Sequence, residues 1–94
     1  MGARLVARRY LVQGMVQGVG FRYFTEHAAR RSRLHGFVRN LDDGRVEAVV
    51  EGDPAAVARF EQAVRNGPPL ARVDRIEIEI RDPAGRFSRF EVRA

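Results

Sequence analysis

The chain has 94 residues, 45% of them hydrophobic, and a formal net charge of +5. This length predicts a single domain, residues 1–94, and the apolar runs fall short of the roughly 20 residues that span a bilayer, so we expect no membrane partner. The absence of cysteine excludes disulfides, thiolate chemistry and cysteine-ligated zinc, and the lack of a long apolar stretch near the N-terminus predicts a cytoplasmic protein.

The first half of the chain predicts a strand, a helix and a hairpin. Residues 5–12 are rich in strand-forming side chains and stop before a glycine, which indicates a strand. Apolar residues at helical spacing predict an amphipathic helix from about residue 22 to residue 33. Residues 36–41 and 45–51 flank an Asp-Gly turn, a strong hairpin signal, so we expect two antiparallel strands. The residues expected on the buried face of the second strand are Val46, Ala48 and Val50.

The second half of the chain predicts a helix and two strands. Asp53 and Pro54 supply an N-cap and a proline at the first helical position, and apolar residues continue at helical spacing to a stop at Asn66. Isoleucine and glutamate alternate over residues 76–80, which indicates a strand with one apolar face, and residues 87–93 predict a short last strand. The order βαββαβ with an extra strand predicts an α+β, ferredoxin-like fold, with two helices packed on one face of a mostly antiparallel sheet.

The chain's one glycine cluster, Gly14, Gly18 and Gly20, lies where the first strand passes to the first helix. The spacing does not match the dinucleotide-binding pattern, and the absence of lysine excludes a Walker-type phosphate loop. Glycine allows positive φ, so successive backbone amides can face one anion, and a helix N-terminus adds free amides and its dipole. These residues predict an anion-binding loop, with an ordinary tight turn as the alternative.

Arg22 and Asn40 are the two side chains that we single out. A cation in the first turn of a helix opposes the helix dipole, so Arg22 is easier to explain as a fork that binds an anion than as a helix-stabilising residue. A solvated surface arginine is the alternative. Asn40 lies at the end of a predicted strand, near the Asp-Gly turn, where a structural role is the more common explanation for asparagine.

Two segments resemble the acylphosphatase family closely. Residues 14–22, Gly-Met-Val-Gln-Gly-Val-Gly-Phe-Arg, match its first signature. Residues 36–44, Gly-Phe-Val-Arg-Asn-Leu-Asp-Asp-Gly, match its second, in the right order and at the right separation. Residues 67–73 look like the family's stretch after the second helix, so the resemblance covers essentially the whole chain. One departure is Met15, at a position that is commonly basic in the family.

The resemblance implies a metal-independent hydrolase of the carboxyl-phosphate bond of acyl phosphates. Arg22 matches the family's phosphate-binding arginine, and Asn40 matches the asparagine that orients the attacking water. We expect no cofactor, a small-molecule acyl phosphate as substrate, phosphate- or sulfate-type anions as ligands of the site, and a monomer. The backbone amides expected to hold the phosphate oxygens are those of Gln17, Gly18, Val19, Gly20, Phe21 and Arg22.

Acyl phosphate chemistry is compatible with so few residues. The conjugate acid of the leaving carboxylate has a pKa of about 4 to 5, so the carboxylate departs without a general acid. If the transition state is loose, holding the phosphoryl oxygens and placing a water in line are sufficient. A phosphate monoester expels a poor alkoxide and would demand a metal or an acid that this sequence does not assemble.

We expect no metal site and no nucleic-acid partner. The aspartates fall at turns and element boundaries, and His27 and His35 have no partner at ligand spacing. An RNA-recognition module shares the βαββαβ order and would suit a basic chain, but residues 36–38 carry only a fragment of its aromatic signature and residues 45–51 contain no aromatic side chain. A second rival is an acylphosphatase-like regulatory domain that binds carbamoyl phosphate without useful turnover.

Overall fold

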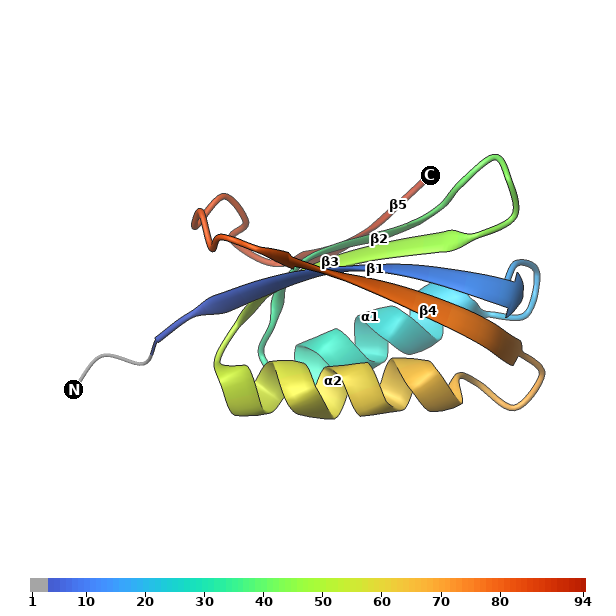
Figure 1. Cartoon of the computed structure of the whole chain (residues 1–94), viewed down its shortest axis with the longest axis horizontal. Coiled ribbons are helices and arrows are strands. Elements are labelled where there is room, and N and C mark those ends of the chain that lie inside the picture. The colour runs from blue at the N-terminus through green and yellow to red at the C-terminus, as the bar shows by residue number, and fades with distance from the viewer. Residues whose placement is uncertain (1–3) are drawn as a thin grey trace.

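The computed structural model describes residues 4–94, and its elements follow the predicted order. The elements are β1 (Val6–Met15), α1 (Phe21–Arg31), β2 (His35–Asn40), β3 (Val46–Gly52), α2 (Pro54–Asn66), β4 (Arg72–Arg81) and β5 (Phe90–Arg93). Within these residues the strands form one sheet in the order β4-β1-β3-β2-β5, in which β2 and β5 pair in parallel and the other neighbours pair antiparallel. Both helices lie against one face of the sheet and leave the opposite, open face uncovered (Figure 1). The predicted α+β, ferredoxin-like architecture is confirmed.

The hydrophobic core lies between the helices and the sheet. Tyr10 of β1 packs against Phe60 of α2 with ring centroids 5.6 Å apart, and Phe60 contacts Phe90 of β5 at 6.4 Å. Complete burial of a large apolar side chain stabilises a fold by about 1.5–3 kcal/mol, so these rings anchor α2 to the sheet. The residues predicted for the buried face of β3 all belong to this core: Val46, Ala48 and Val50.

The second helix begins and ends where the sequence predicts. The Asp53 carboxylate accepts hydrogen bonds from the amides of Ala55 at 3.0 Å and Ala56 at 3.3 Å, which satisfies two free donors of the first turn. Gly67, with a φ of 69°, follows the last helical residue, Asn66. Neither helix in the described part of the chain is long and apolar enough to cross a membrane.

The first strand is longer than predicted, because glycine allows close pairing there. β1 continues past residue 12 to Met15, and Gly14 and Met15 pair with β4 beyond an irregularity in register. A Cβ at Gly14 would lie 2.1 Å from the carbonyl oxygen of Arg72. Gly14 therefore permits contact between two backbones, rather than ending the strand as its sequence position suggests.

The first helix and the hairpin differ from prediction by one or two residues. α1 begins at Phe21 and ends at Arg31, two residues early, and Arg33 beyond it adopts a positive φ of 56° that is incompatible with a right-handed helix. β2 and β3 are each displaced by one residue, to His35–Asn40 and Val46–Gly52. The hairpin itself is confirmed.

The last strand is shorter than predicted. β5 begins at Phe90 rather than at residue 87. Phe87 belongs instead to the loop of residues 82–89, where its ring contacts Phe37 of β2 with centroids 5.9 Å apart. This contact lies on the open face of the sheet, and a pattern of neighbouring residues does not reveal it.

The predicted apolar face of β4 is only partly buried. Ile76 is half-buried, whereas Ile78 and Ile80 are 38% and 76% exposed. In the sheet that residues 4–94 form, β4 is an edge strand with a neighbour on one side only, so its outer residues lack cover. Charged side chains along it, such as the pair of Arg72 and Asp74 at 2.9 Å, oppose edge-to-edge association of two molecules.

On the open face, Glu47 joins the three central strands. Its carboxylate is nearly buried and accepts hydrogen bonds from Arg9 of β1 at 2.6 Å and from Arg39 of β2 at 2.5 Å. Burial by itself raises the pKa of Glu47, but the hydrogen bonds from Arg39 and Arg9 outweigh that effect and hold the pKa below its ordinary value. The carboxylate is therefore charged in the folded protein at neutral pH.

Glu47 is expected to make stability sensitive to acid. Because its folded-state pKa is depressed, its contribution is complete above the unfolded pKa of about 4.3 and is lost as the pH falls through the folded pKa. We expect Glu47→Gln to lower the free energy of unfolding by about 2 kcal/mol at pH 7 and to flatten its decline in acid. Urea unfolding at pH 7 and pH 3 measures both effects, with Glu79→Gln on the exposed edge strand as control. Equal acid sensitivity in the two variants would contradict this role.

Candidate functional site

The loop between β1 and α1 is the first component of the candidate site. Gly18 and Gly20 have φ values of 75° and 78°, in the left-handed region that favours glycine. A Cβ at either position would meet no atom within 4 Å, so the loop faces open space at both glycines. Successive amides in such turns form a concave nest that accepts an anion.

The N-terminus of α1 supplies further free donors. Among the described residues, 4–94, no side chain caps it, and its first turn contains no acidic residue. The amide of Phe24 donates to the carbonyl of Gly20 at 3.0 Å, and the helical hydrogen bonds begin there. The amides of residues 21–23 precede it and have no intrahelical acceptor. Together with the helix dipole, they favour an anion at this end of α1.

Arg22 lies in the first turn of α1 and is held by the C-terminal strand. Its Nη1 donates to the carbonyl oxygen of Arg93 at 2.9 Å, a contact between residues 71 positions apart. A guanidinium carries five N–H donors, so this bond fixes the group and leaves four donors for an anion. The last residues of β5 therefore position Arg22, which the sequence motifs do not indicate.

Asn40 is the last residue of β2 and pairs with the core residue Val46, so it lies on the helix-facing side of the sheet. Its Oδ1 is buried and has no hydrogen-bond partner within residues 4–94. A buried acceptor without a partner costs about 1–3 kcal/mol, so stability alone does not explain this placement. Thr25 Oγ1 on α1 is also buried without a partner in the described chain, and nothing in the structure explains it.

A cavity of about 210 Å³ brings Arg22 and Asn40 together. In Figure 1 the β1–α1 loop and the β2–β3 turn lie at the same end of the molecule, with the C-terminus of β5 nearby. Four of the six residues predicted for the phosphate loop line the cavity, whereas Gln17 and Val19 do not. The lining residues are Val16, Gly18, Gly20, Phe21, Arg22, Tyr23 and Asn40.

Gln17 ties the loop to the hairpin turn with its side chain. Its Nε2 donates to the carbonyl oxygens of Leu41 at 2.8 Å and Arg45 at 3.0 Å. Leu41 directly follows Asn40, so these bonds fix the distance between the β1–α1 loop and the end of β2. The sequence predicts only a backbone role for Gln17. The one sequence signal for a role of its side chain is the presence of an amide side chain inside a glycine-rich loop.

We expect Gln17→Ala to lower the free energy of unfolding by about 1–2 kcal/mol, because two hydrogen bonds of about 1 kcal/mol each are lost. The same change should weaken phosphate binding, since the loop is no longer held beside β2. Urea unfolding and calorimetric titration with phosphate measure the two effects. Gln62→Ala on the exposed side of α2 is the matched control. Identical behaviour of both variants would contradict the proposed role of the Gln17 side chain in holding the loop beside β2.

Asp43 and Asp53, two of the aspartates that the sequence places at turns and element boundaries, serve a turn and a helix cap. Asp43 accepts hydrogen bonds from the guanidinium and the amide of Arg45, in the β2–β3 turn, and these bonds hold the pKa of Asp43 below its ordinary value. Asp53 caps α2. Within residues 4–94, no three His, Cys, Asp or Glu side chains gather where they could hold a metal ion.

The acylphosphatase family model matches residues 8–92, a stretch that contains every residue of the cavity. The chain belongs to the acylphosphatase family. The predicted resemblance is thus confirmed. As a member of this family the chain is a hydrolase, and its substrate is a small-molecule acyl phosphate.

Relatives and solved structures agree with this assignment. Acylphosphatase of Anaeromyxobacter dehalogenans is 51% identical over 88 residues, which cover 94% of this chain and 95% of that protein. The crystal structure of acylphosphatase from Bacillus subtilis has a TM-score of 0.91 and 40% identity, covering 95% of this chain and 99% of that chain. HypF of Thermococcus kodakarensis contains a similar unit, with a TM-score of 0.83 and 40% identity over 95% of this chain but only 12% of HypF.

Proposed function

We propose that this protein hydrolyses the carboxyl-phosphate bond of acyl phosphates without a metal ion, with Arg22 binding the phosphoryl group and Asn40 orienting the attacking water. One observation carries the proposal: the buried Oδ1 of Asn40, which has no hydrogen-bond partner among residues 4–94, belongs to a residue that lines the same cavity as Arg22. An acceptor of this kind suits a water molecule that is held for reaction beside a bound phosphoryl group.

The phosphoryl group binds through amides and one guanidinium. Gly18 and Gly20 shape the loop, and the free amides of residues 21–23 point from the N-terminus of α1 toward the anion. Arg22 adds a charged fork that matches two phosphoryl oxygens. These donors are already in place before substrate arrives, so they stabilise the charge that develops in the transition state without reorganising.

Asn40 acts on the water. Its Oδ1 accepts one hydrogen, which turns a lone pair of the water oxygen toward phosphorus, opposite the bond to the acyl oxygen. The new bond from water oxygen to phosphorus forms as the bond from phosphorus to the acyl oxygen breaks, and the carboxylate leaves with that electron pair. The proton of the water passes to solvent or to a phosphoryl oxygen. A neutral amide suits this position, because a carboxylate would repel the anionic substrate.

The leaving group explains why so few residues are sufficient. A carboxylate whose conjugate acid has a pKa of about 4 to 5 needs no protonation as it departs. With a loose transition state, the remaining requirements are binding of the phosphoryl oxygens and an in-line water. Arg22 with the loop amides meets the first requirement, and Asn40 meets the second.

A direct comparison of substrates tests the proposal. We expect the purified protein to hydrolyse benzoyl phosphate, to leave phenyl phosphate and glycerol phosphate intact, and to keep its activity in EDTA. Loss of activity in EDTA with recovery on adding a divalent metal would contradict the metal-free mechanism. Binding of carbamoyl phosphate without hydrolysis of any acyl phosphate would favour the regulatory-domain alternative.

We propose further that the chain acts as a monomeric single domain in the cytoplasm, with phosphate or sulfate as competing ligands of the loop. Light scattering is expected to give a mass near 10.6 kDa. Phosphate is expected to inhibit benzoyl phosphate hydrolysis competitively, because product and substrate share the phosphoryl site.

A further inference from the structure

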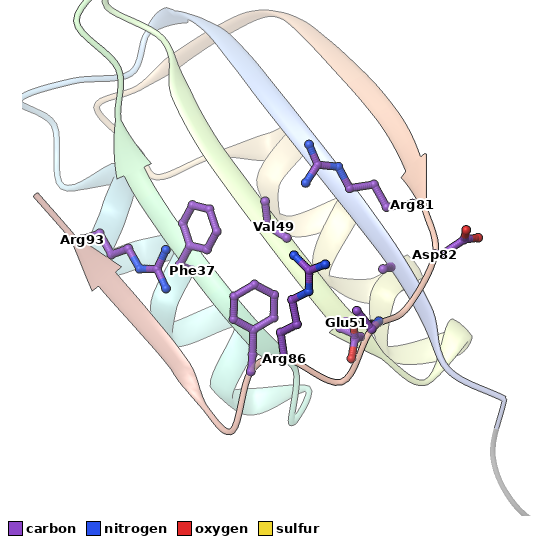
Figure 2. A pocket seen from close by; sticks show the side chains of 10 residues that line it. Phe37, Val49, Glu51, Arg81, Asp82, Arg86 and Arg93 are labelled. Atoms are coloured by element: carbon purple, nitrogen blue, oxygen red, sulfur yellow. Dashed lines mark hydrogen bonds between the residues drawn. The ribbon is translucent and has the colours of Figure 1, made fainter.

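A second cavity, of about 520 Å³, lies on the open face of the sheet and is separate from the phosphate loop. It is bounded by the strands beneath and by the loop of residues 82–89 (Figure 2). It shares no lining residue with the cavity of Arg22 and Asn40. Its volume falls in the range of about 300–1,000 Å³ that is usual for small-molecule sites.

Specific contacts build the wall of this cavity. Glu51 of β3 is 8% exposed, and its carboxylate accepts hydrogen bonds from the amides of Ala84 and Gly85, each at 2.8 Å. Two residues beyond Gly85, the Phe87 ring packs against Phe37 of β2. These two contacts attach the loop of residues 82–89 to the sheet. The cavity between them is therefore a defined feature of the folded chain.

The floor and one side of the cavity are apolar. Ala7 of β1 and Val49 of β3 form the floor and are only 3% and 5% exposed. The half-buried rings of Phe37 and Phe87 stand beside it at an interplanar angle of 56°. A flat aromatic ring placed on Val49 would lie beside both phenylalanine rings, and aromatic rings attract one another in offset or edge-to-face arrangements.

Arginines surround the same floor. In Figure 2 the side chains of Arg81 and Arg86 both point toward Val49, and Asp82 points away from the cavity. Arg93 lies over the Phe37 ring, with its guanidinium carbon 4.1 Å from the ring centroid. The cavity therefore combines an apolar floor with a positively charged rim.

The nearby carboxylates leave this charge only partly compensated. Arg81 pairs with Glu79 at 2.6 Å, and Arg93 pairs with Glu91 at 3.3 Å. Glu51 is occupied by the loop amides. Arg86 forms no ion pair with any residue between 4 and 94, so its guanidinium is free to bind an acidic group that enters the cavity.

We propose that this cavity binds a small aromatic molecule with one acidic group. The ring lies on Ala7 and Val49 against Phe37 and Phe87, and the acidic group accepts hydrogen bonds from Arg86, with Arg81 nearby. The guanidinium fork matches a carboxylate, so an aromatic carboxylate is the simplest such ligand. A ligand without the ring loses the apolar contacts, and one without the acid leaves Arg86 unpaired.

Titration of the full chain with 1-naphthoate, followed by backbone amide NMR and by calorimetry, tests this proposal. We expect shifts at Val49, Gly85 and Phe87, and much weaker binding of acetate and of 1-naphthylmethanol, which lack the ring and the acid respectively. Arg86→Gln is expected to weaken naphthoate binding about tenfold or more. Arg59→Gln on α2, across the molecule from the open face, should leave it unchanged.

A second set of measurements separates this cavity from the phosphate loop. Arg22→Ala is expected to leave naphthoate binding intact, because Arg22 does not line the cavity. Shifts confined to residues 16–23 and Asn40, equal binding of 1-naphthylmethanol, or unchanged affinity in Arg86→Gln would each overturn the proposal. Displacement of naphthoate by a short single-stranded RNA of higher affinity would overturn it in favour of a nucleic-acid surface.

Discussion

Replacing Arg22 by alanine is expected to lower kcat/KM for benzoyl phosphate about 10³-fold or more. Arginines that neutralise charge on a transferring phosphoryl group contribute about 10³–10⁵ to the rate in other phosphoryl-transfer enzymes. Because the guanidinium binds phosphoryl oxygens both before and during the reaction, KM should rise and kcat should fall. Steady-state kinetics with benzoyl phosphate measures the two constants separately.

The shape of the guanidinium can be tested apart from its charge. Arg22→Lys keeps the charge but loses the fork and the geometry of the bond to the Arg93 carbonyl, so we expect it to recover only part of the lost activity. Arg31→Ala, at the other end of α1, is the matched control and should retain full activity. Full activity in Arg22→Ala would remove Arg22 from the mechanism, provided that urea unfolding shows an intact fold.

Local signals in the sequence were sufficient for the fold. The Asp53 cap, the Asp-Gly turn and the period of the apolar residues each concern neighbours along the chain, and each element that they predict exists. Two of the errors lie where distant segments meet. β1 extends to Met15 because β4 pairs with it, and Phe87 leaves the predicted last strand because Phe37 and the loop contacts of Glu51 hold it over the sheet.

In the candidate site, too, the sequence reveals local features but not the contacts between distant segments. The glycine loop and Arg22 stand out in the sequence because glycine φ values and the helix dipole restrict which residues suit those positions, whereas Asn40 stands out only through the second family signature. The groups that position them are not visible there. Gln17 reaches carbonyls 24 and 28 residues away, and Arg22 reaches one 71 residues away, so both contacts depend on how the sheet packs. The open-face cavity likewise requires β1, β2, β3 and the loop of residues 82–89 together.

Replacing Asn40 by alanine is expected to lower kcat about 10²-fold or more with little change in KM. A misplaced reacting group commonly costs about 10²-fold, and Asn40 is proposed to hold the water rather than the phosphoryl group. Asn66→Ala at the exposed end of α2, the other asparagine of the chain, is the matched control. Benzoyl phosphate kinetics on both variants gives the comparison.

Stability separates a catalytic role of Asn40 from a structural one. Its buried Oδ1 has no partner among residues 4–94, so Asn40→Ala should leave the free energy of unfolding unchanged or raise it by about 1 kcal/mol. An asparagine that held the β2–β3 turn together would instead destabilise the protein on removal, and activity and stability would fall together. If Asn40→Ala loses kcat but unfolds at the same or a higher urea concentration, the result supports a role of Asn40 in orienting the water. If the variant is destabilised and kcat is unchanged, Asn40 has a structural role in the β2–β3 turn instead.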